Sequence, residues 1–487
     1  MSMGNMAIAR RSSAKAIILL GLALLSCVAD GVSRGHLFKA SARRSVADTR
    51  KVFDVTAFGA KTEDQMKGGK STAAGVVKLD LPSLPGDEKV DDEKVDDEKM
   101  DSSEEEAGPG EAGPGEGPSD DNASAFIKTW VAACRGNYSG PTKVLIPKGT
   151  FMTGPVIFQG PCTSSKEPIL VEVEGYVKAS TDLSLYASPE WFTFEMVDGL
   201  IVTGEGTFDG QGESTWKSNG CRDKSSCAQA PSSLKFNKVN NTLVERITSL
   251  NSKFFHTHIY GCGNLTMNNV HITAPGDSPN TDGVHISSST NVKVLNSVIG
   301  TGDDCVSIGQ GTHDILVNNI TCGPGHGISV GSLGKRKDDK SVSQIHVSNC
   351  TFRNTTNGAR IKTWAAESAG EASDITYENI VMDQVQNPIV IDQNYGKKKT
   401  KPGTGPAGGA QSKWKISNVH FKNIRGTSSR NIAVSLQCSS SNPCDGIEMA
   451  DINFSYMGAA IKDTALTTEC YNAKIAPKGV QIPPLCR

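Results

Sequence analysis

The pattern of apolar and polar residues repeats along the C-terminal half of the chain. From about residue 242 onward, two apolar residues separated by one position are followed, after one further residue, by asparagine. The copies are Leu265-Met267-Asn269, Val292-Val294-Asn296, Ile315-Val317-Asn319, Ile345-Val347-Asn349, Ile375-Tyr377-Asn379 and Trp414-Ile416-Asn418. They are 27, 23, 30, 30 and 39 residues apart. Alternation with a period of two is typical of β-strands, whose side chains point in turn to the two faces.

A second short strand follows the first within most repeats. These strands are Val284-His285-Ile286, Val306-Ser307-Ile308, Ile328-Ser329-Val330, Ala359-Arg360-Ile361 and Ile389-Val390-Ile391. Paired strands that recur without a helical period between them predict the stacked coils of an all-β, right-handed parallel β-helix. The repeated asparagine is expected to form an internal ladder between coils. The main alternative is a β-propeller, whose blades need about 40 residues or more.

The N-terminus has the pattern of a signal peptide. Arg10, Arg11 and Lys15 precede an apolar run from Ala16 to Leu25, and small residues follow. We expect residues 1–29 to be removed on export. No later stretch approaches the roughly 20 apolar residues that a membrane span needs.

Between the signal and the repeats, composition changes twice. Residues 30–64 include an alternating, strand-like segment, and residues 65–118 form an insert. From Asp87 to Asp121 there are 16 acidic and 3 basic residues, so the rest of the chain carries a net positive charge. The insert buries too little apolar surface to offset the entropy of ordering, which predicts a solvated, disordered loop. Alternatively, this polyanion folds over a basic groove and competes with substrate.

The β-helix domain is expected to span residues 119–487. A short capping helix is predicted from Ala123 to Cys134, where Phe126, Trp130 and Val131 share one face. Such a cap covers the open end of a solenoid, where the core would otherwise meet water.

The cysteines indicate an oxidising compartment. Of 13 cysteines one lies in the signal, and an even number in an exported chain indicates disulfides. The plausible local pairs are Cys221/Cys227, Cys305/Cys322, Cys438/Cys444 and Cys470/Cys486. No cysteine or histidine cluster has metal-ligand spacing, so we expect no metal. Sequons that permit glycosylation begin at Asn122, Asn137, Asn240, Asn264, Asn319, Asn349, Asn354 and Asn453.

The repeat register brings candidate catalytic residues together. Asp282, Asp304 and His326 are 22 residues apart, and each lies two residues before the first apolar residue of a second strand. Equivalent residues on stacked coils are about 4.8 Å apart, so these side chains should form one column on the outer face. Neighbouring aspartates repel each other and shift each other's pKa, which is typical of functional sites. A bound cation is the structural alternative.

Three further charged residues extend this column. Asp303 should leave the backbone in another direction from Asp304, which sets one carboxyl apart from a carboxylate pair. Inverting glycosidases need such a gap, about 6.5–9.5 Å, to hold a water molecule. Arg360 and Lys362 on the next coil suit an acidic substrate, since a guanidinium can bind a carboxylate through two hydrogen bonds. Taken alone, they would be an ordinary solvated pair.

With these residues the sequence resembles the polygalacturonases of glycoside hydrolase family 28. Four blocks match in order: Asn280-Thr281-Asp282, Gly302-Asp303-Asp304, Gly325-His326-Gly327 and Arg360-Ile361-Lys362. The resemblance runs from about Val52 to Arg487, apart from the insert. It implies a pectin-lyase-like solenoid that hydrolyses the α-1,4-galacturonosidic bonds of polygalacturonan with inversion, without a cofactor.

The resemblance also implies catalytic roles. Asp303 would be the general acid that protonates the glycosidic oxygen, and Asp282 and Asp304 would activate water. His326 would tune the acid or orient the substrate.

Four residues would bind substrate by the same resemblance. Arg360 and Lys362 would hold a galacturonate carboxylate, Tyr395 would contact the sugar, and Asn280 would support the subsite. Relatives usually carry Cys-Pro after this tyrosine, whereas here residues 396–399 are Gly-Lys-Lys-Lys. That departure puts substrate affinity and the exo or endo preference in doubt.

The longer matching stretches are most similar to pollen exopolygalacturonases of plants. We therefore expect a secreted, monomeric, exo-acting enzyme of the cell wall whose partner is pectin, with no nucleic-acid or membrane partner. The alternatives are an endo-polygalacturonase, a calcium-dependent pectate lyase and a non-catalytic pectin-binding wall protein.

Overall fold

The structure is a computed structural model that describes residues 49–68, 122–164, 166–217, 229–365, 368–396, 411–457 and 465–486. The signal-like segment, nearly all of the acidic insert, the Cys221/Cys227 pair and the lysine run after Tyr395 lie outside these ranges. The predictions made for them therefore stay predictions. No helix among the described residues is long and apolar enough to cross a bilayer.

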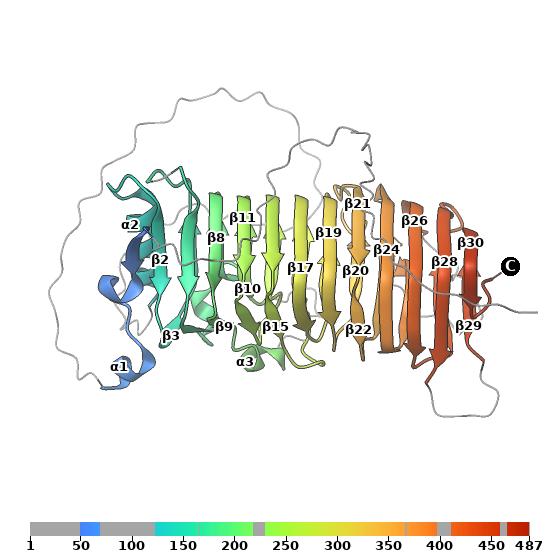
Figure 1. Cartoon of the computed structure of the whole chain (residues 1–487), viewed down its shortest axis with the longest axis horizontal. Helices are drawn as coiled ribbons and strands as arrows, with labels where there is room; N and C mark the ends of the chain where they lie inside the picture. Colours follow the sequence, from blue (N-terminus) through green and yellow to red (C-terminus); the bar gives the residue numbers. More distant parts are fainter. Residues whose placement is uncertain are drawn as a thin grey trace, which may run out of the picture. The chain divides into compact units, whose positions relative to one another are not determined.

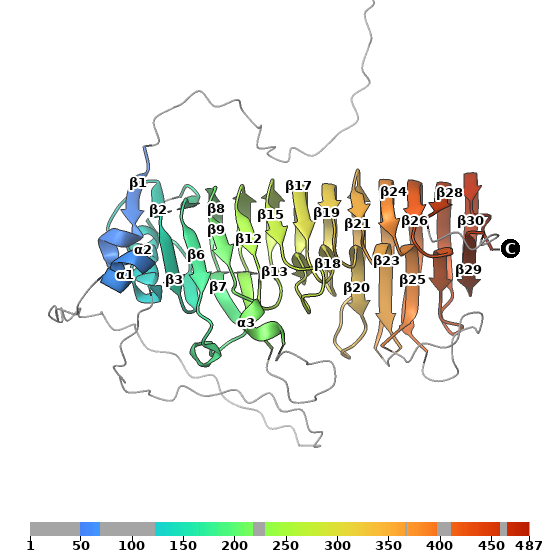
Figure 2. The ribbon, with the colours of Figure 1, turned by 90° about the horizontal axis from the view of Figure 1, so that it is seen from below.

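The described strands form two parallel sheets that wind around one core. The coils follow one another in chain order from β2 beside helix α2 to β29 and β30 (Figure 1). The view turned by 90° shows β13, β18, β20, β23 and β25 of the second sheet in a row (Figure 2). Every named strand pairing is parallel, which confirms the predicted β-helix and excludes the antiparallel blades of a propeller.

The larger sheet contains 19 of the described strands. They are β1 (Lys51–Asp54), β2 (Thr142–Ile146), β3 (Thr150–Thr153), β5 (Ile169–Val173), β6 (Tyr176–Ala179), β8 (Asp198–Gly204), β9 (Thr207–Asp209), β11 (Asn240–Glu245), β12 (Thr248–Leu250), β14 (Gly263–Asn268), β15 (His271–Thr273), β17 (Thr290–Gly300), β19 (His313–Cys322), β21 (Val342–Ser348), β22 (Thr351–Arg353), β24 (Ala369–Val385), β26 (Lys413–Ser428), β28 (Cys444–Tyr456) and β30 (Ala473–Ile482).

The second sheet has 11 strands among the residues described, and it carries the candidate site. They are β4 (Val156–Gln159), β7 (Glu190–Glu195), β10 (Ser232–Asn237), β13 (Thr257–Tyr260), β16 (Val284–Ser287), β18 (Val306–Ile308), β20 (Ile328–Leu333), β23 (Asn357–Trp364), β25 (Asn387–Tyr395), β27 (Ile432–Gln437) and β29 (Thr467–Tyr471). The helical segments are η1 (Val55–Phe58), α1 (Glu63–Gly68), α2 (Ala123–Arg135), η2 (Leu183–Leu185) and α3 (Glu213–Trp216).

Helix α2 confirms the predicted cap but not the whole of its predicted face. Phe126 and Trp130 are buried, and Trp130 stacks on Phe158 of β4 with ring centroids 4.6 Å apart. Val131 is wrong as a core residue, since 47% of its surface is exposed. The buried face continues instead through Ala133 and Cys134, the positions three and four residues beyond Trp130.

The asparagine ladder exists, but it lies on the surface and not inside the coils. The amide of Asn319 donates to Asn296 at 2.8 Å, and that of Asn423 donates to Asn379 at 2.9 Å; both contacts are exposed. These four residues have φ between 48° and 57°, the left-handed bend that asparagine tolerates better than most residues. The ladder therefore follows from backbone geometry at the corner of each coil.

The last predicted repeat is one corner out of register. Ile375 pairs with Val419, so Asn379 aligns with Asn423 and not with Asn418. Asn418 belongs to a second row of left-handed corners and donates to Asp374 at 2.5 Å.

The described cysteines form four disulfides. Three of the predicted local pairs are confirmed: Cys305–Cys322, Cys438–Cys444 and Cys470–Cys486. A fourth, Cys134–Cys162, ties the capping helix to the first coils. The expectation that all cysteines pair is wrong, because Cys262 and Cys350 are free and buried, where they pack as small apolar side chains.

Candidate active site

The strand register of the second sheet brings the predicted site residues together. Val284 of β16 pairs with Val306 of β18, which pairs with Ile328 of β20. Asp282, Asp304 and His326, each two residues earlier, therefore stand at equivalent positions on three consecutive coils, as expected. Arg360 on β23 pairs with Ser329 on β20, which places the basic residues on the next coil.

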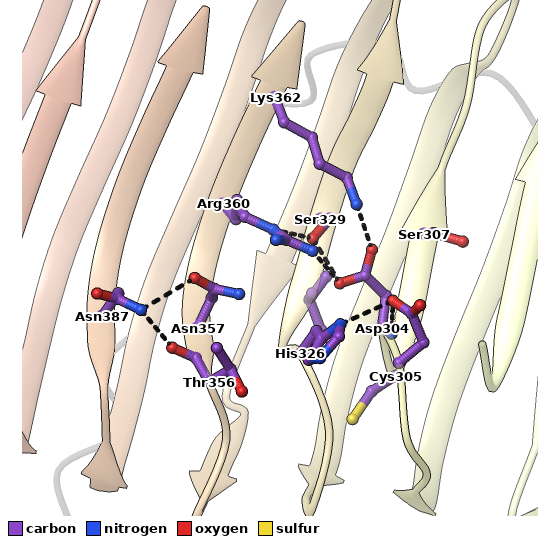
Figure 3. A network of polar contacts seen from close by, with 12 residues as sticks. Asp304, Cys305, Ser307, His326, Ser329, Thr356, Asn357, Arg360, Lys362 and Asn387 are labelled. Atoms are coloured by element: carbon purple, nitrogen blue, oxygen red, sulfur yellow. Dashed lines mark hydrogen bonds and ion pairs between the residues drawn. The ribbon is translucent and has the colours of Figure 1, made fainter. Parts of the chain in front are cut away.

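Asp304 is the centre of a buried ion-pair network. Arg360 Nη2 lies 2.6 Å from its Oδ1, and Lys362 Nζ lies 2.9 Å from its Oδ2. The Ser329 hydroxyl donates to Asp304 Oδ1 and accepts from Arg360 Nε, both at 2.8 Å. Figure 3 shows both cations pointing at this carboxylate, whose side chain is 1% exposed. A buried carboxylate needs such partners, because leaving it unpaired in a low dielectric is costly.

His326 pairs with Asp303, not with the other members of its column. Its Nδ1 lies 2.9 Å from Asp303 Oδ1, which also accepts the backbone N–H of Asp304 at 2.8 Å. Burial disfavours the ionised form of Asp303. The hydrogen bond from His326 and the charges of His326, Lys362 and Arg360 outweigh that effect and lower the pKa of Asp303 to about 2.

The bend that holds Asp303 depends on Gly325. This residue has φ +147°, and a Cβ on it would lie 2.6 Å from the Asp303 carbonyl oxygen. Only glycine allows this close approach of the two coils, so the Gly-His-Gly block supports the pairing of Asp303 with His326.

Asp282 differs from both neighbouring carboxylates. It is buried, with 7% of its surface exposed. Burial, followed by the charges of Asp303 and Asp304, raises its pKa well above the usual range despite a hydrogen bond with Ser307. The site thus holds one aspartate that resists ionisation beside one that favours it.

The remaining predicted residues lie at the margins of the site. Tyr395 at the end of β25 has its ring centroid 5.2 Å from Lys362 Nζ, so it joins the basic side of the network. Asn280 is exposed, two residues before Asp282 in a left-handed bend. The structure brings Tyr395 to the cations and leaves Asn280 at the edge.

The region from residue 137 to residue 479 matches the family model described as glycosyl hydrolases family 28. The chain belongs to this family. It is 48% identical over 340 residues to an exopolygalacturonase of Arabidopsis thaliana, a match covering 70% of this chain and 76% of that protein. An exopolygalacturonase of Platanus acerifolia is 43% identical over 363 residues, covering 74% of this chain and 93% of the relative.

Solved structures share the fold of this family 28 chain. The exopolygalacturonase from Thermotoga maritima has a TM-score of 0.60 at 19% identity, covering 74% of this chain and 87% of the other. The polygalacturonase from Erwinia carotovora has a TM-score of 0.59 at 22% identity, covering 74% and 95%.

Two hydroxyl groups in the family 28 network were not expected. Ser307 and Ser329 are the second residues of β18 and β20, where they form hydrogen bonds with Asp282 and Asp304. Serine is common and small, so its identity alone gave no sign of this role. The signal that could have found them is their place in the strand row that contains Arg360.

Asp303, Asp304 and His326 also have the composition of a metal site, with one potential ligand atom from each within 4.8 Å of the others. Asp304, however, already contacts two cationic side chains. A bound cation would meet their repulsion at short range, so the donor set fits an ion-pair network better than a metal.

Proposed function

We propose that this chain hydrolyses α-1,4-galacturonosidic linkages of polygalacturonan with inversion, releasing galacturonate from chain ends. One observation carries the proposal: three carboxylates, a histidine and two cations from four consecutive coils gather at one place, where Asp304 pairs with both cations, Asp303 pairs with His326, and Asp282 lies close enough for both other aspartates to raise its pKa. A carboxyl group that donates a proton and a carboxylate that accepts one are what acid–base cleavage of a glycosidic bond requires. The identity to plant exopolygalacturonases supports galacturonan as substrate and exo action.

Arg360 and Lys362 would release the Asp304 carboxylate and bind the carboxylate of the substrate in its place. In the free protein both contact Asp304. A galacturonate carboxylate entering the site would draw these cations toward itself. Asp304, released from these two ion pairs, would then be free to contact the attacking water. Asp304 would take a proton from the attacking water, and Asp282, whose raised pKa disfavours its ionised form, would position that water by a hydrogen bond.

Asp303 would be the general acid, as the family resemblance implies. In the free protein its pKa is lowered to about 2, so Asp303 must take up a proton from solvent when the substrate binds. The carboxylate of the sugar adds negative charge beside the Asp303–His326 pair, which favours proton uptake by that pair. His326 would hold this proton next to Asp303 until it is delivered to the glycosidic oxygen.

Catalysis would take place outside the cell, in the wall. The four disulfides among the described residues support an oxidising compartment. The signal-like N-terminus of the sequence supports export by the same route.

Product analysis on polygalacturonate tests the activity. We expect saturated galacturonate monomer from the first time point, with activity unchanged by a chelator. Asp303→Asn should lower the rate at least about 100-fold, whereas Asp314→Asn, an exposed aspartate at a left-handed corner of β19, should not. Mixed oligomers would indicate endo action, unsaturated and calcium-dependent products a lyase, and binding without cleavage a wall-binding protein.

A further inference from the structure

At the ends of β20, β23 and β25, the network around Asp304 borders two side chains that the proposed catalysis does not use, Trp364 and Lys335. Trp364 of β23 pairs with Tyr395 of β25, and their ring centroids are 5.1 Å apart at 83°. Lys362, the catalytic-site cation, lies over Tyr395. The aromatic pair therefore begins where the network around Asp304 ends.

A second lysine lies on the far side of this pair. Lys335 Nζ is 5.3 Å from the centroid of Trp364. Lys335 is exposed, and among the residues described here no carboxylate forms an ion pair with its ammonium group. It differs in this from Lys362, whose charge is already neutralised by Asp304.

The loop that carries Lys335 is held in place by its own aspartate. One carboxylate oxygen of Asp339 accepts the backbone N–H groups of Gly334 and Lys335, each at 2.9 Å, and that of Arg336 at 3.4 Å. The Asp339 charge is thereby directed at the backbone, and Lys335 and Arg336 point outward as exposed cations. A cation on an ordered loop loses less entropy on binding than one on a free chain.

Trp364 is fixed as well. A Cβ at position 396 would lie 2.1 Å from its Cζ3, so the backbone of Gly396 packs directly against the indole. Gly396 has φ +82°, a conformation that glycine adopts freely. The ring is thus supported from one direction and faces Lys335 in another.

We propose that Trp364 and Lys335 form a binding subsite for a further galacturonate unit, beyond the unit held by Arg360 and Lys362. The subsite takes an acidic pyranose: its C–H face packs on the indole and its carboxylate receives the ammonium group of Lys335. The lysine exchanges a weak contact with the ring for a salt bridge. This inference rests on the proposed function, in which Arg360 and Lys362 hold one galacturonate unit and the polymer therefore extends over the coils that follow the carboxylates.

Substrates of increasing length test the subsite. Lys335→Met should raise the KM for polygalacturonate about fivefold, the effect of roughly 1 kcal/mol at an exposed ion pair, with kcat unchanged. The KM for digalacturonate, which is too short to reach Trp364, should stay the same. Lys415→Met, an exposed lysine on β26 of the other sheet, is the matched control and should behave as the wild type.

A second pair of variants addresses the ring. Trp364→Phe should keep most of the affinity for polymer, and Trp364→Leu should lose about as much as Lys335→Met. An equal rise in KM for dimer and polymer, or no change for either with Lys335→Met, would overturn the subsite.

Calorimetry with trigalacturonate separates this proposal from the proposed function. Weaker binding by Lys335→Met in a protein that cleaves no galacturonan would retain the subsite and reject the catalytic assignment. If an active protein binds trigalacturonate equally well as Lys335→Met and as wild type, the subsite is rejected and the catalytic assignment is retained.

Discussion

Along the outer face of the second sheet, the histidines on one side of the carboxylates are neutral, whereas Arg360 on the other side is charged. One row of paired positions runs from Lys235 through His258, His285, Ser307 and Ser329 to Arg360. We call β10, β13 and β16 the N-terminal flank and β20, β23 and β25 the C-terminal flank. Both flanks carry basic side chains, and the flanks differ in whether a buried carboxylate lies beside them.

On the N-terminal flank, burial makes the histidines neutral. Burial and the positive charges nearby lower the pKa of His258 to about 2 and that of His285 to about 4. Phe255 stacks on His285 with centroids 4.6 Å apart and an angle of 18°. The two histidines therefore add no charge to this side, and Phe255 makes the surface beside His285 aromatic.

On the C-terminal flank, Arg360 keeps its charge because Asp304 is buried beside it. Burial alone would lower the pKa of Arg360, but Asp304 reverses that effect and raises it. The comparison teaches that a basic residue in this row remains a cation only where a carboxylate shares its burial. A polyanion should accordingly extend over the C-terminal flank and end against the N-terminal flank.

The largest expected effect comes from removing the negative charge of Asp304, which pairs with Arg360 and Lys362 on the C-terminal flank. Asp304→Asn leaves Arg360 and Lys362 buried without a counter-charge, and should lower the free energy of unfolding by about 3–5 kcal/mol. On the N-terminal flank, His285→Gln removes no charge and should cost less than about 1.5 kcal/mol. Urea denaturation of both variants measures the contrast. Similar losses would mean that the two flanks do not differ in charge state.

The carboxylates between the flanks should respond to pH in opposite ways. Asp303 has a folded pKa of about 2 against an ordinary value of 3.8, so it stabilises the fold above that range and loses this effect as pH falls. Asp303→Asn should cost about 2 kcal/mol near neutral pH and almost nothing near pH 2. Asp282 has a raised folded pKa, so burying its charge destabilises the fold as pH rises above 3.8.

Asp282→Asn should therefore stabilise the protein near neutral pH and leave its acid stability unchanged. Denaturation midpoints across the acidic range give both curves, with Asp314→Asn as the control. If the two curves shift in the same direction, the opposite pKa shifts are wrong.

A moderate effect is expected from opening the N-terminal flank. Phe255 is half-buried, and its turn is held by hydrogen bonds from Ser233 N and Ser252 Oγ to its carbonyl oxygen. Phe255→Ala should remove the aromatic surface on His285 without displacing the turn. We expect dimers among the first products and a KM about five- to tenfold higher, by chromatography of early time points. Phe254→Ala alters the neighbouring ring and should leave monomer as the first product.

Much of this architecture could be predicted from the repeat period of the sequence. The predictions that failed did so for physical reasons. The rows of buried aliphatic residues were predictable, because an interior position admits little else. The register failed at Asn418 because two rows of left-handed corners both use asparagine, five residues apart, and both fit the same pattern. The cysteine count failed because Cys262 and Cys350 serve as apolar core residues, which parity does not detect.

At the site, residues in register were predictable and contacts across a bend were not. Asp282, Asp304 and His326 each lie two residues before a strand of the second sheet, so their spacing revealed them. The pairing of His326 with Asp303 depends on how the chain turns at Gly325, which no spacing encodes. The ion pairs of Arg360 and Lys362 with Asp304 were missed, because both side chains were expected to contact only the substrate.

The smallest effect should come from the lysine of the N-terminal flank. Lys235 Nζ lies 3.4 Å from Glu190 Oε1, donates to His258 Nδ1 at 3.0 Å and rests 5.6 Å from the ring of Tyr260. With these partners its charge is largely satisfied within the protein. Lys235→Met should change the KM for polygalacturonate less than about twofold, within the range of a surface ion pair. A change as large as that expected for Lys335→Met would show that the polymer crosses both flanks, as endo action requires.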